Sequence, residues 1–418
     1  MHRTSYWKTT LMALGGAGVS LLAIVALSQI GLRGAVAAAT LLPLILVFLI
    51  SSIVASGGFV CLWRDARISS GKVDIFAVWA NRPPTKGWLS SLGLRFVLGP
   101  SLRPGDDVQV KSLAEIQATL DASGSVEGLP FMAEMRPYCG KTFLVHRRID
   151  KINDMRLKTG LRRMHDAVTL TDLRCSGAEH NGCQAECQIL WKDEWLTRLP
   201  AGSGPQGGQR SADLIAHMPD APGFNPGVET HVCQMTRLWE ASRPMSRVDI
   251  RQDLRPLLSG NIGLGAYSLA LLTRLFNTVQ KWRGGTDFPA MTPAALAPPP
   301  EASPGALFGP RQKVCVRGRE DIALTLVKSR TKGLWFDRDM VRFCGQPAVM
   351  RKHVNRVIHE ASGKMVMMKT PSVVLEDVVA TGEFLRLCPQ HEYIFWREVW
   401  LRPVGAEIQE TADSHSSR

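Results

Sequence analysis

The sequence predicts a mainly β protein with α-helices: an N-terminal transmembrane helical hairpin, then two tandem small SH3-like β-barrel modules joined by a partly helical linker region. Two observations predict this architecture. The chain opens with two long uncharged apolar stretches, and two later segments of about 95 residues repeat each other at an offset of 205 residues. With 418 residues, of which 45% are hydrophobic and 21% charged, the chain is long enough for several globular units. The composition excludes collagen-like, coiled-coil and fully disordered classes.

The two apolar stretches cover residues 11–31 and 35–62 and contain no charged side chain. About 20 helical residues cross the hydrocarbon core of a bilayer, so each stretch is long enough to span it. Because only residues 32–34 separate them, we expect an antiparallel transmembrane hairpin at residues 1–63. The alternative is a cleaved signal peptide with a small-residue site at Ala35–Ala37, but this leaves the second stretch unexplained.

Basic residues flank the hairpin and predict its orientation. They are Arg3 and Lys8 before the first stretch, and Arg64, Arg67 and Lys72 after the second. Positive charges are retained on the cytoplasmic side of a membrane. We therefore expect an inner (cytoplasmic) membrane protein whose two ends, and everything after Trp63, lie in the cytoplasm. The formal net charge of +13 suits an anionic partner, such as a lipid leaflet, a nucleic acid or an acidic protein.

An internal repeat is the strongest signal in the rest of the chain. Residues 128–140 align with residues 333–345, with six of thirteen positions identical. Further matches at the offset of 205 are Val168 with Val373, Asp172 with Asp377, Cys183 with Cys388, Trp191 with Trp396, Trp195 with Trp400, and Leu196 with Leu401. We therefore expect a first β module at residues 106–200 and a second β module at residues 311–405.

Each module is expected to contain short strands and one brief helix. In the first module, alternating apolar residues predict strands at residues 108–110, 143–149 and 167–173, and a helical pattern covers residues 114–120. Short strands in so few residues are typical of a small antiparallel barrel, SH3-like in style.

Four further segments complete the expected organisation. Residues 64–105 form a juxtamembrane connector, residues 201–285 a loop and helical insert, residues 286–310 a Pro-rich linker, and residues 406–418 a polar tail. Within the insert, residues 262–276 are apolar but too few to span a bilayer. They predict a helix packed on one of the barrels, with an interfacial helix on the membrane leaflet as the alternative.

A cysteine cluster in the first module predicts a metal site. Cys175, Cys183 and Cys187 have the spacing C-x7-C-x3-C, His180 lies between the first two, and Cys233 follows in the insert. Four thiolates around one centre suit zinc or an iron–sulfur cluster, and the spacing leaves the choice between them open. Unliganded thiols are one alternative, and disulfides are another if the hairpin has the opposite orientation.

The second module provides an internal control for this site. At the offset of 205 the cluster is mostly lost: Cys175 corresponds to Ala380, His180 to Leu385 and Cys187 to Glu392, while Cys183 is kept as Cys388. Residues kept in both modules are those that the fold needs. We therefore interpret Trp191 and Trp195 as core residues, with a role in covering the cysteines as the alternative, and Cys139 and Cys344 as small buried apolar residues.

The repeated motifs also support a resemblance. Met135, Cys139 and Gly140 form a Met-x3-Cys-Gly block, which precedes the cysteines and the Trp-x3-Trp-Leu motif at Trp191, Trp195 and Leu196. Over residues 100–405 the chain resembles an uncharacterised bacterial family with duplicated modules of this kind, the first carrying a Cys-rich segment. The resemblance implies at most an accessory role in a biosynthetic pathway.

No catalytic motif is present: the chain lacks a Gly-rich phosphate loop, His-Glu-x-x-His and Gly-x-Ser-x-Gly. We therefore expect a membrane-anchored, cytoplasm-facing accessory or scaffold protein, with the lipid membrane and a protein as partners and a cysteine-bound metal in its first module. The first alternative is an iron–sulfur electron-transfer subunit serving an enzyme partner. The second is a nucleic-acid-binding protein, in which the basic triplets at residues 146–148 and 351–353 line a surface for phosphates.

Overall fold

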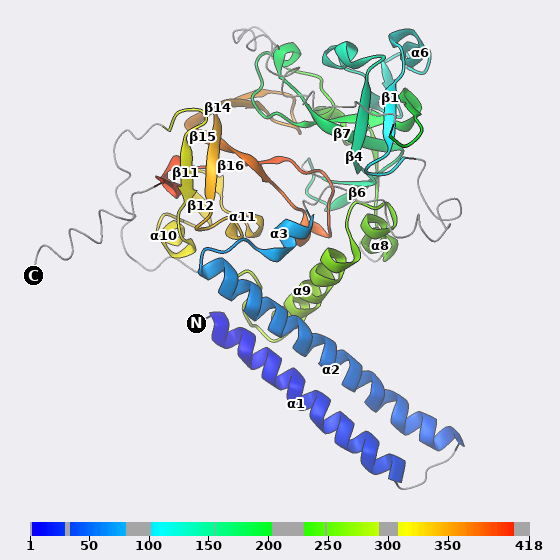
Figure 1. The fold of residues 1–418 in the computed structure, drawn as a ribbon, viewed down its shortest axis with the longest axis vertical. Coiled ribbons are helices and arrows are strands. Elements are labelled where there is room, and N and C mark those ends of the chain that lie inside the picture. The colour runs from blue at the N-terminus through cyan, green and yellow to red at the C-terminus, as the bar shows by residue number, and fades with distance from the viewer. Residues whose placement is uncertain are drawn as a thin grey trace, which may run out of the picture.

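The computed structural model describes residues 2–29, 34–80, 102–154, 156–202, 230–246, 249–291 and 308–404. The polar tail, most of the Pro-rich linker, much of the connector and the first part of the insert lie outside the described residues. The described part is a mixed α and β structure with two N-terminal apolar helices and two five-stranded sheets (Figure 1).

Two long helices form the predicted hairpin. Helix α1 covers His2–Gln29 and helix α2 covers Gly34–Ser69, and both are long and apolar enough to cross a membrane. They pack side by side and project away from the sheets (Figure 1). A side chain at Gly58 of α2 would overlap the hydroxyl of Thr10, so the glycine permits the close approach of the two helices. Helix α2 continues beyond the expected end at Trp63 and reaches the second sheet.

The first module contains the antiparallel sheet β8-β7-β4-β1-β9. Its strands are β1 (Asp107–Val110), β4 (Thr142–Arg148), β7 (Ala167–Arg174), β8 (Gln188–Lys192) and β9 (Leu196–Arg198). Strands β1, β4 and β7 confirm the three predicted strands. Helix α6 (Leu113–Gln117) confirms the short helix, and Ser112 caps it by accepting from the Glu115 backbone NH.

The second module contains a sheet with the same order of equivalent strands, β16-β15-β14-β11-β17. Its strands are β11 (Lys313–Val316), β14 (Pro347–Ile358), β15 (Met365–Val379), β16 (Tyr393–Trp396) and β17 (Leu401–Pro403). The corresponding short helices are α10 (Arg319–Leu324) and α11 (Arg338–Val341), and the corresponding short hairpin is β12 (Arg330–Thr331) with β13 (Leu334–Trp335).

The remaining short elements surround the first sheet. They are β2 (Ser125–Val126), β3 (Leu129–Pro130), the 3-10 turn η1 (Ala133–Tyr138), and the three-stranded sheet of β10 (Ser242–Pro244), β6 (Leu161–Met164) and β5 (Lys151–Asn153).

The repeated tryptophans occupy the two cores. Trp191, Trp195, Trp396 and Trp400 are fully buried. The Trp195 indole NH donates to Thr119 Oγ1 at 3.1 Å, and Trp400 donates to the equivalent Thr325 Oγ1 at 2.9 Å. The donors of Trp195 and Trp400 are satisfied in the same way, whereas those of Trp191 and Trp396 have no partner. The complete burial of all four rings confirms that they are core residues.

The insert forms two helices, α8 (Arg251–Leu258) and α9 (Leu264–Trp282). Helix α9 extends beyond the predicted residues 262–276, and its main partners are α2 of the hairpin and the short helix α3 (Ile75–Ala80), rather than a sheet. The helix also contacts the second module, because Phe276 is buried in one apolar cluster with core residues of that module such as Val314, so the expected packing on a module is confirmed in part. Gly57 permits the close contact between α9 and α2, because a Cβ there would lie 2.8 Å from the backbone oxygen of Leu272.

A buried ion-pair network fixes the end of α2 to the second module. Arg64 pairs with Asp74 and with Glu383, each at 2.6 Å, and Arg342 pairs with Glu383 at 2.8 Å. Burial by itself would raise the pKa of Asp74, but the Arg64 guanidinium outweighs burial and holds this pKa below its ordinary value. Buried charges are stable only when paired, so these contacts fix the helix end in one position.

Candidate metal centre

The cysteine-containing loop of the first module connects β7 to β8 and includes the 3-10 turn η2 (Ala178–His180). Gly177 begins this turn with φ of 76°, and a side chain there would overlap the backbone oxygen of Cys183. The Gly177 carbonyl accepts from the backbone NH of both His180 and Gly182, each at 3.0 Å. This confirms that a glycine allows the loop to fold tightly, because only a residue without Cβ fits.

Three potential ligand atoms converge next to this turn. They belong to Cys175, His180 and Glu134, and all lie within 4.8 Å of one another. Cys175 begins the loop, His180 ends η2, and Glu134 comes from the turn η1, which packs against η2. Thiolate, imidazole and carboxylate are all ligands of zinc in proteins.

Three atoms of Glu134 and His180 are buried without a hydrogen-bond partner. The exposed fractions of the two residues are 5% and 6%, and neither carboxylate oxygen nor the imidazole Nε2 has a hydrogen bond. His180 Nε2 lies 3.3 Å from Glu134 Oε1, which is ion-pair distance without hydrogen-bond geometry. Buried polar groups almost always have partners, and lacking one costs free energy. A bound cation would satisfy all of these atoms.

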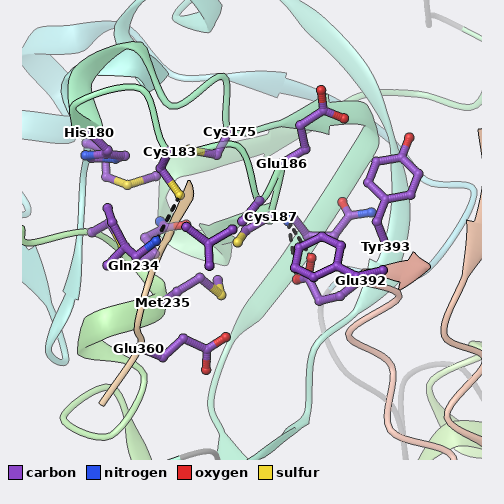
Figure 2. A pocket seen from close by; sticks show the side chains of 17 residues that line it. Cys175, His180, Cys183, Glu186, Cys187, Gln234, Met235, Glu360, Glu392 and Tyr393 are labelled. Carbon is purple, nitrogen blue, oxygen red and sulfur yellow. Dashed lines mark hydrogen bonds between the residues drawn. The ribbon is translucent and has the colours of Figure 1, made fainter. Parts of the chain in front are cut away.

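The predicted site residues line one cavity of about 220 Å³ between the two modules (Figure 2). The first module and the insert contribute the candidate ligands to its wall, namely Cys175, His180, Cys183, Cys187 and Cys233. The second module contributes the opposite wall, which includes Val357, Ile358, Glu360, Glu392, Tyr393 and Phe395. Residues as far apart in the sequence as Met132 and Phe395 therefore line the same cavity.

The cysteines differ in how closely they approach the three converging atoms. Among the described residues, only Glu134, Cys175 and His180 form a set of three ligand atoms within 4.8 Å. Cys183 Sγ accepts from the backbone NH of Ile358 at 3.4 Å and so interacts with the second module. A centre with four cysteine ligands stays a prediction. All nine cysteines of the chain are free thiols in the structure.

Burial favours the protonated form of three thiols at the cavity, those of Cys175, Cys187 and Cys233. It raises the pKa of Cys175, and the neighbouring Glu134 carboxylate raises this pKa further. Burial also raises the pKa of Cys187 and Cys233. Metal binding by these thiols would therefore release protons, because the metal ligand is the thiolate.

The second module shows how an acid at the position of Glu134 is satisfied when no cluster is present. Asp339 Oδ2 accepts from the backbone NH of Thr381 at 2.7 Å, and Asp339 Oδ1 pairs with Arg342 at 2.8 Å. At the offset of 205, Arg342 corresponds to Pro137 in the first module, which cannot form an ion pair. Glu134 has therefore lost the cation that its counterpart uses.

Glu134 is the site residue that the sequence interpretation missed. A signal for it existed, because the repeat aligns Glu134 with Asp339 and so keeps an acid at one position of a mostly apolar block. Its proximity to Cys175 depends on contact between η1 and η2, which are far apart in the sequence.

Two carboxyl groups of the second module face the same cavity (Figure 2). Burial raises the pKa of Glu360 to about 7. Burial likewise raises the pKa of Glu392 to about 7, although Arg174 at 3.6 Å opposes this effect. Near neutral pH, both groups therefore exist as a mixture of charged and neutral forms.

Four cations of the basic triplets are buried or paired inside the molecule. Arg147 and Arg148 are buried, and Arg148 pairs with Asp193 at 2.6 Å. In the second triplet, Arg351 and Lys352 both pair with Glu186 of the first module, at 2.7 and 2.8 Å. These cations therefore contribute to the structure, and a phosphate-binding role for the triplets stays a prediction.

Comparison of the chain with protein-family models, with curated proteins and with solved structures gives no match. The function must therefore be argued from the site itself.

Proposed function

We propose that the protein is a membrane-anchored accessory or scaffold protein, with its β modules in the cytoplasm and a metal ion bound in the first module. Cys175, His180 and Glu134 are the proposed primary ligands, and Cys183, Cys187 and Cys233 are further candidates around the same cavity. The observation that carries this proposal is the convergence of three ligand atoms within 4.8 Å, together with the buried Glu134 oxygens and His180 Nε2, which have no hydrogen-bond partner.

Zinc is the metal that this donor set favours. Zinc accepts sulfur, nitrogen and oxygen ligands together, whereas iron–sulfur clusters are held mainly by cysteine thiolates. The mixed set of one cysteine, one histidine and one glutamate therefore supports zinc. The four cysteines around the cavity keep an iron–sulfur cluster as the alternative, with electron transfer to an enzyme partner as its function.

The two modules are inferred to be SH3-like barrels that arose by duplication. The identical order of equivalent strands and the equivalent Trp–Thr hydrogen bonds support the duplication. In this proposal the copies have diverged in role: the second module attaches to α2 through the Arg64 network, while the first holds the metal. A structural metal stabilises a small domain because binding free energy becomes folding free energy.

Membrane anchoring follows from the two apolar helices, whose length and composition suit a bilayer. Basic residues at the open end of the hairpin support a cytoplasmic location for the modules.

Elemental analysis with an absorption spectrum tests the metal. The full chain is purified in detergent, without chelators and under anaerobic conditions, together with Cys175→Ser and His180→Ala. The matched control is Cys315→Ser, a half-buried cysteine on β11 outside the cavity. We expect about one zinc per colourless chain, a loss of most zinc in the two site variants, and no loss in the control.

A brown protein with visible charge-transfer absorption would replace zinc by an iron–sulfur cluster. Wild-type protein that retains no metal after incubation with excess zinc would contradict the metal proposal altogether.

A further inference from the structure

Helix α9 lies at the level of the apolar part of α2. Its Leu272 backbone oxygen and its Phe276 side chain approach the space above Gly57. Gly57 belongs to the uncharged stretch of α2, and the first charged residue after it, Arg64, is about 10 Å further along the helix axis at 1.5 Å per residue. The middle of α9 therefore lies beside the uncharged stretch of α2 and not beside its charged end.

The C-terminal end of α9 lies beside the first turns of α1. Gln280 Oε1 accepts from the Thr9 hydroxyl at 2.8 Å, and Arg283 Nη2 donates to the Ser5 backbone oxygen at 3.3 Å. Ser5 and Thr9 immediately precede the apolar stretch of α1. Helix α9 is thus fixed to both helices of the hairpin near the end where they leave the apolar region (Figure 1).

An apolar stripe covers the outer face of α9. It consists of Leu264, Leu271, Leu275 and Trp282, which are 53%, 41%, 38% and 84% exposed. The spacing of seven, four and seven residues places these side chains along one side of the helix. The opposite side of the helix is buried and includes the polar residues Thr273, Asn277 and Gln280, which pack within the molecule.

Exposed tryptophans occur on all three helices of this region. Trp7 on α1 is 46% exposed, Trp63 on α2 is 48% exposed, and Trp282 ends α9. Tryptophan is enriched where the hydrocarbon core meets the headgroups. Lys281 and Arg283 flank Trp282, as expected near anionic headgroups.

We infer that α9 is a third membrane-contacting element, which lies in the interface of the leaflet and inserts its apolar stripe between lipids. The occupant of the stripe is the lipid bilayer, because the stripe continues the apolar surface of the hairpin on which α9 packs. This inference rests on the proposed membrane anchoring. It places the insert, and the first module connected to it, against the membrane surface.

Fluorescence quenching in proteoliposomes tests the inference on the full chain. Lipids brominated near the top of the acyl chain quench tryptophans that insert into the interface. The variant is Trp282→Phe, and the matched control is Trp335→Phe, an indole that is 55% exposed on β13 of the second module. We expect Trp282→Phe to remove at most about one third of the lipid-quenched emission, because Trp282 is one of three exposed indoles that the described residues place at this level, with Trp7 and Trp63. The control should remove none of it.

Flotation of the same vesicles separates this inference from the anchoring. If the chain floats with lipid and Trp282→Phe leaves the quenching unchanged, α9 does not contact lipid and the inference is wrong, while the anchoring stands. If the chain does not float, both are wrong. A dimer in detergent that Leu271→Glu with Leu275→Glu converts to a monomer, together with unchanged quenching, would assign the stripe to a second copy of the chain.

Discussion

The loop at residues 175–187 and its counterpart at residues 380–392 have the same backbone conformation, but the buried acids next to them have different partners. Both begin at a glycine with positive φ, Gly177 and Gly382, and both continue through a 3-10 turn. In the second loop the adjacent acid, Asp339, is satisfied by backbone amides and Arg342. In the first loop the adjacent acid, Glu134, has no hydrogen-bond partner and faces a cysteine and a histidine.

This difference indicates how two modules with the same strand order can differ in their ability to bind a metal ion. The backbone turn and the buried acid belong to the shared scaffold. The first module has Pro137 where the second has Arg342, so it lacks the internal cation, and Cys175 and His180 lie nearby as potential ligands for an external one. The proposed metal ion thus occupies the electrostatic role that Arg342 has in the second module.

The largest expected effect comes from removing the cation of the second module. In Arg342→Met, the carboxylates of Asp339, Glu383 and Asp74 lose a buried partner. Removing one partner of a buried ion pair costs about 3–5 kcal/mol of unfolding free energy. Denaturant unfolding in detergent measures this loss. The control is Arg338→Met, whose 37% exposed side chain pairs with Asp287 and should cost less than about 1 kcal/mol. Equal stability of the two variants would contradict the comparison.

Substitution of the two equivalent acids, Glu134 and Asp339, should have a smaller effect on stability. For Glu134 the sign of this effect should differ between the metal-free and the zinc-bound protein. Without metal, Glu134→Gln removes a buried carboxylate that has no hydrogen bond, so we expect it to stabilise the protein by about 1–2 kcal/mol. With zinc bound, the same substitution removes a ligand and should destabilise the protein. Asp339→Asn should destabilise by about 1.5–3 kcal/mol in both conditions, because it weakens hydrogen bonds to a charged group.

Thermal unfolding with chelator and with excess zinc measures all four values. The same sign for Glu134→Gln in the two conditions would show that Glu134 does not bind the ion.

The smallest expected effect is on the pH dependence of stability. It involves Glu360, which lies on the cavity wall that the second module contributes. Glu360 has a pKa of about 7 in the folded protein, which is above its ordinary value of 4.5. Between these two values the folded chain keeps a proton that the unfolded chain has lost. The stability that this group contributes is therefore present at low pH and lost as pH rises towards 7.

We expect Glu360→Gln to stabilise the metal-free protein at pH 8 by about 1 kcal/mol and to reduce the decline in stability between pH 5 and 8. Unfolding at several pH values, with chelator present, measures both. Glu376→Gln on β15, a residue outside the cavity, is the control and should keep the wild-type decline. An unchanged decline in Glu360→Gln would show that Glu360 is not buried in its charged form.

The sequence was sufficient for features that depend on local pattern. Apolar length predicted the hairpin, alternation predicted β1, β4 and β7, and the repeated tryptophans predicted the two cores. Each of these signals lies within a short stretch of chain, where periodicity and steric limits act directly.

The sequence alone determined that this chain has two apolar helices, a repeated strand pattern, and cysteines gathered next to a flexible turn. Only the tertiary structure decided that Glu134 lies next to Cys175 and His180. It also decided that residues of the second module such as Val357 and Tyr393 line the other side of the cavity, and that α9 packs on the hairpin. These contacts join residues that are tens to hundreds of positions apart. They depend on how whole sheets and helices fit together, and a residue's own neighbours in the sequence do not carry that information.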